Sequence, residues 1–470
     1  MGSTQTYTHN LGHERKESAA TIAVNVDTSS KEVGGEGPKP EAGEEVEEGG
    51  EKEFPDGGLR AWGTVFGAFM INFSCYGVVT SFGVFEQYYS THQLSTSPLS
   101  AIAWIGSLQL ALVLLMGCVS GPLFDAGYLK PMIAGAGTFY VFCLFMTSLA
   151  TEFYQFVLAQ GLGVGICMGL LYSPAMSTIG HHFAPHGRKI VAFGVFSTGA
   201  SIGGALVPIA MRRLLESVGF AWAMRTLAFL VMFSILCGFL FCNTRLPPRN
   251  GSRVLDFTFG TVHTASLFLG RHSSAWVSMH QLAMALRMPL PRGVDQSTAF
   301  YSLSLLNALS IPGRLLPNLL AQRLAGPLNT LIACCILTGA LDIVWPFVRA
   351  GPGGAGVLGF NAAFGLASGG YVSMLAPAIT SLDDSHGSNT HQQLKKGQTT
   401  GVKLGMAFFV TSFCWLASAP VQGALIRRRP GGTDEYWPAG VFSGAMVLLG
   451  VAMIGVARWI VGRRMGRWDV

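Results

Sequence analysis

The chain has 470 residues, of which half are hydrophobic and only 12% are charged. Soluble globular domains carry roughly 25% charged residues, so this composition excludes an ordinary soluble protein. Residues 1–56 hold 13 of the 25 acidic and 5 of the 31 basic residues, which leaves residues 57–470 with a net charge of +14. At roughly 20 residues per span, this remainder can form a dozen transmembrane helices. The composition therefore indicates an all-α polytopic membrane protein, with the lipid bilayer as its main surroundings.

Residues 1–56 are rich in Glu, Gly, Ser, Thr and Lys and nearly lack aromatic residues. Such a segment cannot bury enough apolar surface to offset the entropy of ordering, so we expect a disordered acidic tail. It could carry a phosphorylation or degradation signal, or act only as a solubilising leader. Because no basic stretch followed by an apolar run marks a cleavable signal peptide, we expect the first span to direct insertion and the tail to stay cytosolic.

Eleven apolar runs are long enough to cross a bilayer. They cover residues 61–82, 101–123, 132–150, 153–174, 190–211 and 222–241 in the first half, and 299–320, 328–347, 357–378, 404–426 and 439–460 in the second. Between the two groups, residues 254–288 are moderately apolar but contain two arginines and three histidines. This segment is either a weak seventh helix or the product of a wrongly predicted exon.

The placement of Lys and Arg favours an even number of spans. With the N-terminus inside and twelve helices, most basic residues between spans fall on the cytosolic side, as the positive-inside rule predicts. We therefore predict a six-helix bundle over 57–243, a basic connector starting at 244–253, a second bundle over 254–462 and a cytosolic C-terminus at 463–470. Two such halves are typical of transporters with a site at their interface.

Ionisable residues at membrane depth are costly and are candidates for function. Arg314 lies in the middle of its run, so we expect it to face a cavity, where a substrate anion would supply the opposite charge, or to form a structural ion pair. Asp342 lies near the end of its run, and we predict a solvated interfacial acid rather than a proton carrier. Asn72 and Tyr76 give the first run polar groups that either line a pathway or join helices.

Other polar patterns predict no chemistry. His181, His182 and His186 lie beside basic residues without a carboxylate or thiolate, so we interpret them as part of a basic cytosolic loop rather than a metal site. Glycines recur between 161 and 169 and between 199 and 204, which predicts close helix packing. No nucleophile with a base, metal-ligand spacing or cofactor loop stands out. We therefore expect neither an enzyme nor a bound cofactor or metal.

Several motifs occur in a fixed order along residues 55–465. They are Pro55-Asp56-Gly57-Gly58, Ser81-Phe82-Gly83-Val84-Phe85, Gly121-Pro122-Leu123-Phe124-Asp125, Gly313-Arg314 and Gly405-Met406-Ala407-Phe408. Together they resemble the monocarboxylate transporter family of the major facilitator superfamily, in its fungal branch. The resemblance implies the major facilitator fold, with twelve helices in two six-helix bundles, cytosolic termini and alternating access by rocking of the halves.

The resemblance also implies roles for single residues. Asp125 matches the acid that helps hold the two bundles together, a gating role, although Ala126 stands where that motif often has Arg. Proton-coupled lactate carriers of the family use a Lys in the first helix and an Asp in the eighth, together with an Arg. The matching positions here are Thr80, Ser310 and Arg314, so only the Arg is kept and lactate–proton symport by that mechanism is not expected.

We therefore predict a secondary transporter of the plasma membrane that moves a small organic acid or acidic secondary metabolite, with efflux as the favoured direction. The predicted substrate-binding residues are Arg314, Thr80, Ser310, Asn72 and Tyr76, and Asp125 is the predicted gating residue. The alternatives are an uptake carrier for a nutrient such as a monocarboxylate or riboflavin, and a non-transporting sensor with the same fold. The expected partner is a small organic anion, not a nucleic acid, and the expected functional unit is a monomer.

Overall fold

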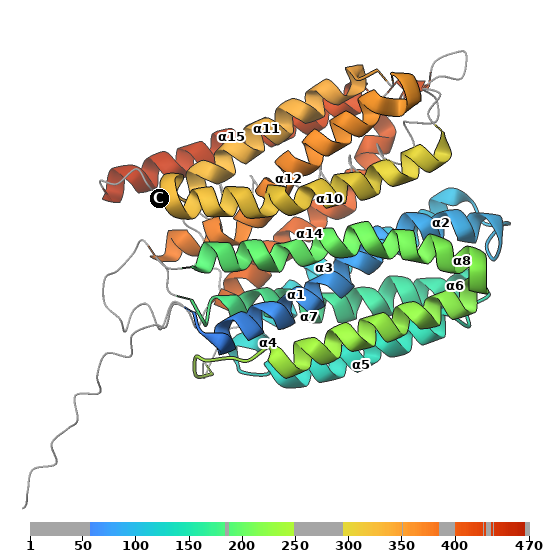
Figure 1. The fold of residues 1–470 in the computed structure, drawn as a ribbon, viewed down its shortest axis with the longest axis horizontal. Coiled ribbons are helices and arrows are strands. Elements are labelled where there is room, and N and C mark those ends of the chain that lie inside the picture. Colours follow the sequence, from blue (N-terminus) through green and yellow to red (C-terminus); the bar gives the residue numbers. More distant parts are fainter. Residues whose placement is uncertain are drawn as a thin grey trace, which may run out of the picture. The chain divides into compact units, whose positions relative to one another are not determined.

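The computed structural model describes residues 57–183, 188–248, 295–349, 351–384, 400–425, 427–428, 434–435 and 437–465. The predicted acidic tail and the predicted weak seventh helix, residues 254–288, lie outside these ranges, as does His186. The described chain is almost entirely helical (Figure 1). The strands among the described residues are β1 (Arg427–Arg428) and β2 (Asp434–Glu435), of two residues each, which pair antiparallel.

Helices of the first half are often broken into shorter pieces. They are α1 (Leu59–Thr80), α2 (Phe82–Thr91), α3 (Leu99–Leu115), α4 (Gly117–Asp125), α5 (Leu129–Thr147), α6 (Phe153–Phe156), the π-helix η1 (Val157–Val164), α7 (Gly165–Ile179) and α8 (Lys189–Phe241). The α6, η1 and α7 segments follow one another without a break and together form one candidate membrane span. α1 with α2, and α3 with α4, also form one candidate span each, although one residue, Ser81 or Met116, separates the two pieces.

Helices of the second half follow the same pattern. They are α10 (Gln296–Leu320), the π-helix η4 (Ala321–Ala325), α11 (Pro327–Val344), the 3₁₀ turns η5 (Trp345–Phe347) and η6 (Pro352–Gly354), α12 (Ala355–Asp384), α14 (Thr400–Leu425) and α15 (Trp437–Met465). Each of the eleven apolar runs identified in the sequence overlaps one of the helices in the two halves.

Helix α8 contains two of the predicted runs. Its 53 residues would extend for about 80 Å as one straight helix, far more than the roughly 30 Å of bilayer hydrocarbon. The helix is interrupted at Gly219, whose φ of 74° and ψ of 173° are not helical. Glycine adopts this backbone conformation without the steric cost of a Cβ atom, so the chain can turn between the runs at 190–211 and 222–241.

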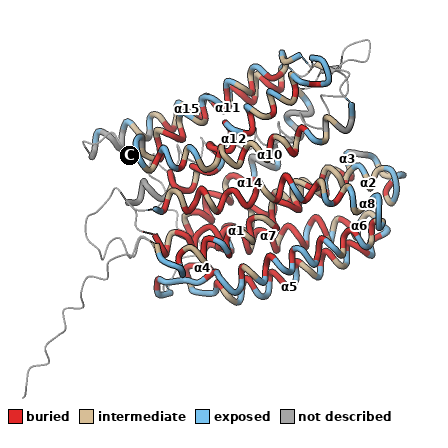
Figure 2. The backbone as a smooth tube through the Cα atoms, viewed as in Figure 1, coloured by how far each residue is buried: buried red, intermediate tan, exposed pale blue. Residues whose placement is uncertain are grey.

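The helices carry the surface expected in lipid. Eight segments among the described residues are long and apolar enough to cross a membrane. Large apolar side chains such as Phe233, Leu236 and Leu240 are more than half exposed, an arrangement that water would penalise and lipid tolerates. Buried residues lie on the faces that helices turn toward one another (Figure 2).

Glycine contacts allow α1 to pack closely along both parts of α8. A Cβ atom added at Gly203 would strike the carbonyl oxygen of Phe73, and one added at Gly238 would lie 2.6 Å from Ile71. Lipid provides no hydrophobic drive between helices, so dispersion contacts at such short approach become important. The predicted packing role of the glycines at 199–204 is thereby confirmed.

Two further close contacts involve α10 and α14. Helix α10 packs on α12 and also on the first part of α8, and α14 packs on α3 and α4 (Figure 1). At the α4/α14 crossing, Gly117 and Gly121 face Gly405 and Gly401 so closely that the backbones are in contact. The two parts of the sequence therefore meet along α8/α10 and along α3 and α4 with α14.

The α4/α14 crossing yields a stability prediction. In Gly121→Ala the new methyl group would lie within 3.0 Å of the Gly401 carbonyl oxygen, and rigid backbone cannot move aside as a flexible side chain can. We expect the variant to lose about 1–3 kcal/mol of stability, the usual cost of overpacking, and to unfold at a lower temperature in detergent. The matched control is Gly135→Ala in α5, where no atom lies within 4 Å of the added Cβ. Equal unfolding temperatures for the two variants would contradict the close crossing.

Candidate functional site

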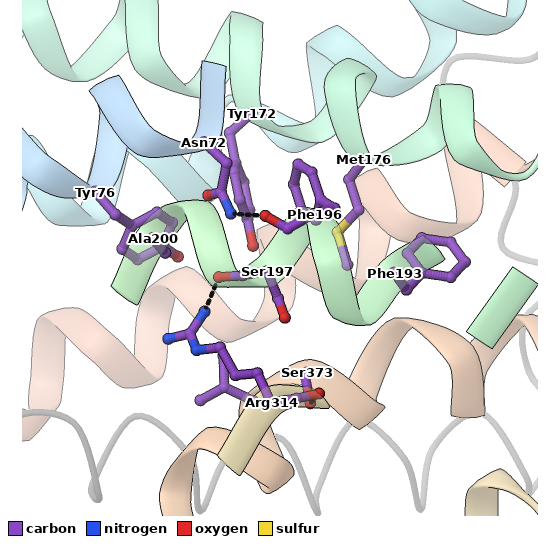
Figure 3. A pocket seen from close by; sticks show the side chains of 11 residues that line it. Asn72, Tyr76, Tyr172, Met176, Phe193, Phe196, Ser197, Ala200, Arg314 and Ser373 are labelled. Carbon is purple, nitrogen blue, oxygen red and sulfur yellow. Dashed lines mark hydrogen bonds between the residues drawn. The ribbon is translucent and has the colours of Figure 1, made fainter. Parts of the chain in front are cut away.

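A cavity among the described residues lies between helices of the two halves (Figure 3). One side is formed by α1, α7 and α8, and the other by α10 and α12. The lining residues are Asn72, Tyr76, Tyr172, Met176, Phe193, Phe196, Ser197, Ala200, Arg314, Val372 and Ser373. The space open to the centre of a water molecule is about 30 Å³, which suffices for roughly two or three waters. The cavity is therefore small.

Arg314 is the one charged residue in the cavity lining. Its side chain reaches from α10 toward the backbone of α8, where Nη1 donates a 2.5 Å hydrogen bond to the carbonyl oxygen of Ser197 (Figure 3). Its Nε atom is buried and has no hydrogen-bond partner. No carboxylate of the described chain forms an ion pair with it. Among the described residues, the guanidinium thus keeps unused donors and a charge without an ion-pair partner, the properties of an anion-binding group.

Neighbouring residues fix the backbone from which Arg314 extends. The Asn318 Nδ2 atom donates to the carbonyl oxygen of Arg314 at 2.5 Å and to Ser373 Oγ at 2.7 Å. Ser373 Oγ in turn lies 3.3 Å from the same carbonyl oxygen. These bonds join α10 to α12 within the second half. The base of the Arg314 side chain is therefore held in place while its tip remains free to change partners.

Aromatic rings form the wall opposite Arg314. Tyr172 on α7 is the centre of this wall, with ring centroids 5.3 Å from Tyr76, 6.2 Å from Phe196 and 5.3 Å from Phe408 on α14. Edge-to-face and tilted ring pairs of this kind add to the energy of simple burial. The cavity thus combines one cation with an apolar wall.

Asn72 adds a neutral acceptor to the lining. Its Nδ2 donates a 2.8 Å hydrogen bond to the carbonyl oxygen of Phe196, which fixes the orientation of the amide (Figure 3). Its Oδ1 is buried and has no partner. A buried acceptor without a partner is costly, so Asn72 is suited to receive a proton donor such as a hydroxyl group of a ligand.

The structure brings together three of the five predicted substrate-binding residues, namely Arg314, Asn72 and Tyr76. Thr80 and Ser310 are not among the lining residues. The Thr80 hydroxyl donates to the carbonyl oxygens of Tyr76 and Gly77 on its own helix. The Ser310 hydroxyl is buried at 2.6 Å from the hydroxyl of Ser201 on α8. Both residues lie on helices that line the cavity but at positions away from it.

Sequence patterns did not single out the aromatic wall or Ser197. Tyr172, Met176, Phe193 and Phe196 lie in apolar runs, where each is as compatible with a lipid-facing or core position as with a cavity. Only the approach of α7, α8 and α10 distinguishes these possibilities. Ser197 contributes its backbone carbonyl to Arg314, and a backbone group leaves no signal in the residue type.

Asp125 connects the end of α4 to the beginning of α14. Its Oδ1 accepts a 3.0 Å hydrogen bond from the Gly401 amide, and its Oδ2 accepts one of 2.8 Å from the Val402 amide. The first amides of a helix lack partners within the helix and carry partial positive charge, so a carboxylate is well placed there. Asp125 is 4% exposed, which strengthens the interaction. Its predicted gating role stays a prediction, with this contact as its structural basis.

His181 and His182 lie in the turn that follows α7, and both are buried. The Nε2 atom of His182 lies 2.7 Å from the carbonyl oxygen of Asn243, which requires the ring to donate. Burial lowers the pKa of His182, the hydrogen bond to Asn243 raises it, and the nearby charge of Arg245 lowers it. The net shift is downward, so the neutral ring joins the end of α7 to the end of α8. Within the described ranges, no cluster of three metal-binding side chains occurs.

The prediction of a solvated Asp342 is wrong. The residue is completely buried, and neither carboxylate oxygen has a hydrogen-bond partner in the described chain. The reason is that α15 covers this end of α11, where a Cβ at Gly440 would lie 3.1 Å from the Asp342 carbonyl oxygen. Position near a helix end therefore does not guarantee contact with water, because a neighbouring helix can extend past that end.

Comparison with known proteins agrees with this architecture. The family profile described as Major Facilitator Superfamily matches residues 64–465. The aspyridones efflux protein apdF of Emericella nidulans is 33% identical over 429 residues, which cover 88% of this chain and 82% of that protein. The fujikurins efflux protein of Gibberella fujikuroi is 32% identical over 410 residues, covering 85% of this chain and 83% of that protein.

Solved structures show the same fold. The crystal structure of the transporter FucP in its outward conformation superposes with a TM-score of 0.62, covers 83% of this chain and 98% of its own, and is 14% identical. The chain therefore belongs to the Major Facilitator Superfamily, and it is a multi-pass membrane transporter. The predicted fold class is confirmed.

The Asp125 contact predicts a local change in backbone protection. Asp125→Ala removes the acceptors of two amides at the start of α14, a loss typically worth about 1 kcal/mol at a helix N-terminus. We expect faster hydrogen–deuterium exchange in peptides that contain Gly401 and Val402, with a smaller increase in Asp125→Asn, which keeps one acceptor oxygen. Glu216→Ala, which removes an exposed carboxylate paired with Arg212, is the control and should leave these peptides unchanged. Unchanged exchange in Asp125→Ala would show that the contact does not protect α14.

Proposed function

We propose that this transporter exports an acidic small molecule, as a member of the monocarboxylate porter family, and that Arg314 binds the anionic group of the substrate. The observation that carries the proposal is the guanidinium of Arg314 in a cavity between the two halves, with no ion-pair partner in the described chain. A charge at membrane depth is costly, and a structural role would call for a permanent acid beside it. A substrate anion, present only while it is bound, would supply the missing negative charge.

The remaining lining supports a substrate with an apolar part. Tyr172, Phe193 and Phe196 offer aromatic surface across the cavity from Arg314, and Met176 adds a side chain that adapts readily to different shapes. The free Oδ1 of Asn72 supports a hydroxyl or another donor on the substrate. An acidic secondary metabolite, with a charged group and a conjugated or apolar body, matches this combination better than a very small acid such as lactate.

Similar proteins support export as the direction of transport. Two of the similar proteins are named for the efflux of aspyridones and of fujikurins, and both are matched over more than four fifths of their length. The proposal includes cytosolic termini, which the positive-inside distribution of Lys and Arg supports, and the plasma membrane, because export from the cell takes place there. Ser310 and Thr80 replace the charged coupling residues of lactate carriers, so coupling to protons through those two positions is not part of the proposal.

The proposal is tested by transport through Arg314 variants. Purified protein is reconstituted into vesicles, and the exchange of a panel of organic acids that includes lactate, benzoate and decanoate is measured. Hydrogen bonds to charged groups are worth about 1.5–3 kcal/mol, so we expect Arg314→Ala to lower transport of accepted acids by about 10- to 100-fold. Arg314→Lys should keep part of the activity, because it retains the charge but not the two-pronged geometry.

The matched control is Arg323→Ala, which removes an exposed arginine from η4, directly after the helix that carries Arg314. This variant should transport at the wild-type rate. The uncharged analogue benzamide should not compete with benzoate in any variant. If Arg314→Ala transported every accepted acid as fast as Arg323→Ala at equal protein content, Arg314 would not be the anion-binding residue.

A further inference from the structure

Arg314 belongs to the cavity and also to an ordered line of contacts between α8 and α10. We call this line the α8/α10 interface and define it by four residue pairs. They are Gly194 with Asn318, Ser197 with Arg314, Ser201 with Ser310, and Gly204 with Asn307. The residue number rises by three or four along α8 as it falls by three or four along α10. Each step is one helical turn, so the pairs form a single stripe between antiparallel helices.

The contacts in this stripe are polar and short. Arg314 donates to the Ser197 carbonyl at 2.5 Å, the hydroxyls of Ser201 and Ser310 lie 2.6 Å apart, and Asn307 Nδ2 donates to the Gly204 carbonyl at 3.3 Å. Among these bonds, the one from Arg314 involves a full charge. Hydrogen bonds with one ionised partner are stronger than neutral ones, so the Arg314 bond is the strongest link of the line.

The same guanidinium is required by the substrate under the proposed function. A carboxylate binds arginine best through two parallel bonds to one edge of the guanidinium. The edge that contains Nε is buried. The other edge is formed by the two terminal nitrogens and contains Nη1, one of whose two N–H groups donates to Ser197. A carboxylate that binds through this edge therefore shares Nη1 with the Ser197 carbonyl.

The size of the cavity leads to the same conclusion. It accepts roughly two or three water molecules, whereas an organic acid with an apolar body has many more atoms. The lining spans α1, α7 and α8 on one side and α10 and α12 on the other. Room for such a molecule can be made by separating these two sides, and Arg314 with Ser197 is the contact that joins them at the cavity itself.

We propose that the anionic group of the substrate and the Ser197 carbonyl compete for the Arg314 guanidinium, so that substrate binding opens the α8/α10 interface. The inference rests on the proposed function and adds how the bound anion acts on the fold. The exchange is favourable because a carboxylate is a stronger acceptor than a backbone carbonyl. Once Arg314 changes partner, only the neutral bonds at Ser201 and Asn307 and the van der Waals contact at Gly194 hold the line together.

This competition links occupancy of the cavity to the contact between the two halves. Without an anion, the bond from Arg314 to the Ser197 carbonyl holds the α8/α10 interface closed. With an anion bound to Arg314, this bond is lost. Linkage is reciprocal, so an interface held closed must also weaken anion binding by the same factor. Asn318 and Ser373 hold the backbone of Arg314 in both cases, because their bonds are to its carbonyl oxygen and not to the guanidinium.

Cross-linking of the neighbouring pair measures the opening. In the double variant Ser201→Cys with Ser310→Cys, the two sulfur atoms would be adjacent in the closed interface, as the 2.6 Å between the hydroxyls implies. An added oxidant, copper phenanthroline, takes two electrons and the thiols release two protons as the disulfide forms. The rate is read by mass spectrometry of the peptide pair containing residues 201 and 310. The single-cysteine variants report background from the native thiols.

Two results are expected. Without any ligand, adding Arg314→Ala to the double variant should slow cross-linking by about 10- to 100-fold, the range of a lost hydrogen bond to a charged group. With Arg314 present, each of the three acids, lactate, benzoate and decanoate, that raises the unfolding temperature of the protein should slow cross-linking by a similar factor. Benzamide should not slow cross-linking. An anion that stabilises the protein through Arg314 without changing the cross-linking rate would overturn the inference alone. If none of the three acids stabilised the protein, the proposed function would fail and this inference with it.

A second measurement covers the case in which the double cysteine variant does not fold. Hydrogen–deuterium exchange of the otherwise unmodified chain is compared with Arg314→Ala for peptides covering 190–205 and 303–318. Both peptides should exchange faster in Arg314→Ala, while a peptide covering 132–147 in α5 should not change. Equal exchange in all three peptides would show that Arg314 does not hold the interface closed.

Discussion

The arrangement of the two halves depends on Arg314, a cation without an ion-pair partner among the described residues, which must remain hydrated or bonded inside a membrane. Arg314 cannot face lipid without a large penalty, and the described chain offers it no acid. The fold meets this constraint by turning the residue toward the other half, where the Ser197 carbonyl and a small polar space receive it. The cavity, the α8/α10 interface and the support from Asn318 and Ser373 are all arranged around this side chain.

Close approach of the helices is a precondition for that arrangement. Helix α10 can place Arg314 against α8 because glycines let it approach both neighbours: Gly313 meets the backbone of Leu366 on α12, and Gly194 of α8 receives Asn318. A larger side chain at either glycine would move α10 and carry the guanidinium away from Ser197. Packing without side chains at these points therefore fixes the position of a charge within about one turn of them, since a helix moves as a rigid element.

Much of the architecture could be predicted from the sequence, because span length, hydropathy and loop charge are local properties. Arg314, Asn72 and Tyr76 could be selected since polar side chains within apolar runs are conspicuous. Thr80 and Ser310 are predicted from family position, which does not determine whether a residue faces the cavity or the neighbouring helix. The burial of Asp342 could not be predicted because it depends on α15, which is nearly 100 residues further along the chain. The aromatic wall around Tyr172 required knowledge of helix rotation, which hydropathy in a uniformly apolar run does not provide.

The contacts between the halves differ in how directly an anion can act on them. The α4/α14 contact consists of apposed glycines and of Asp125 bound to two backbone amides, and none of these groups lines the cavity. The α8/α10 interface has its strongest bond inside the cavity lining. Under the proposed competition, a negatively charged ligand acts directly on the α8/α10 interface, because it takes up Arg314. It can affect the α4/α14 contact only indirectly, through the movement of rigid helices. This difference suggests an order of events, in which the α8/α10 interface responds to the substrate first and the Asp125 contact follows when α14 moves with its half.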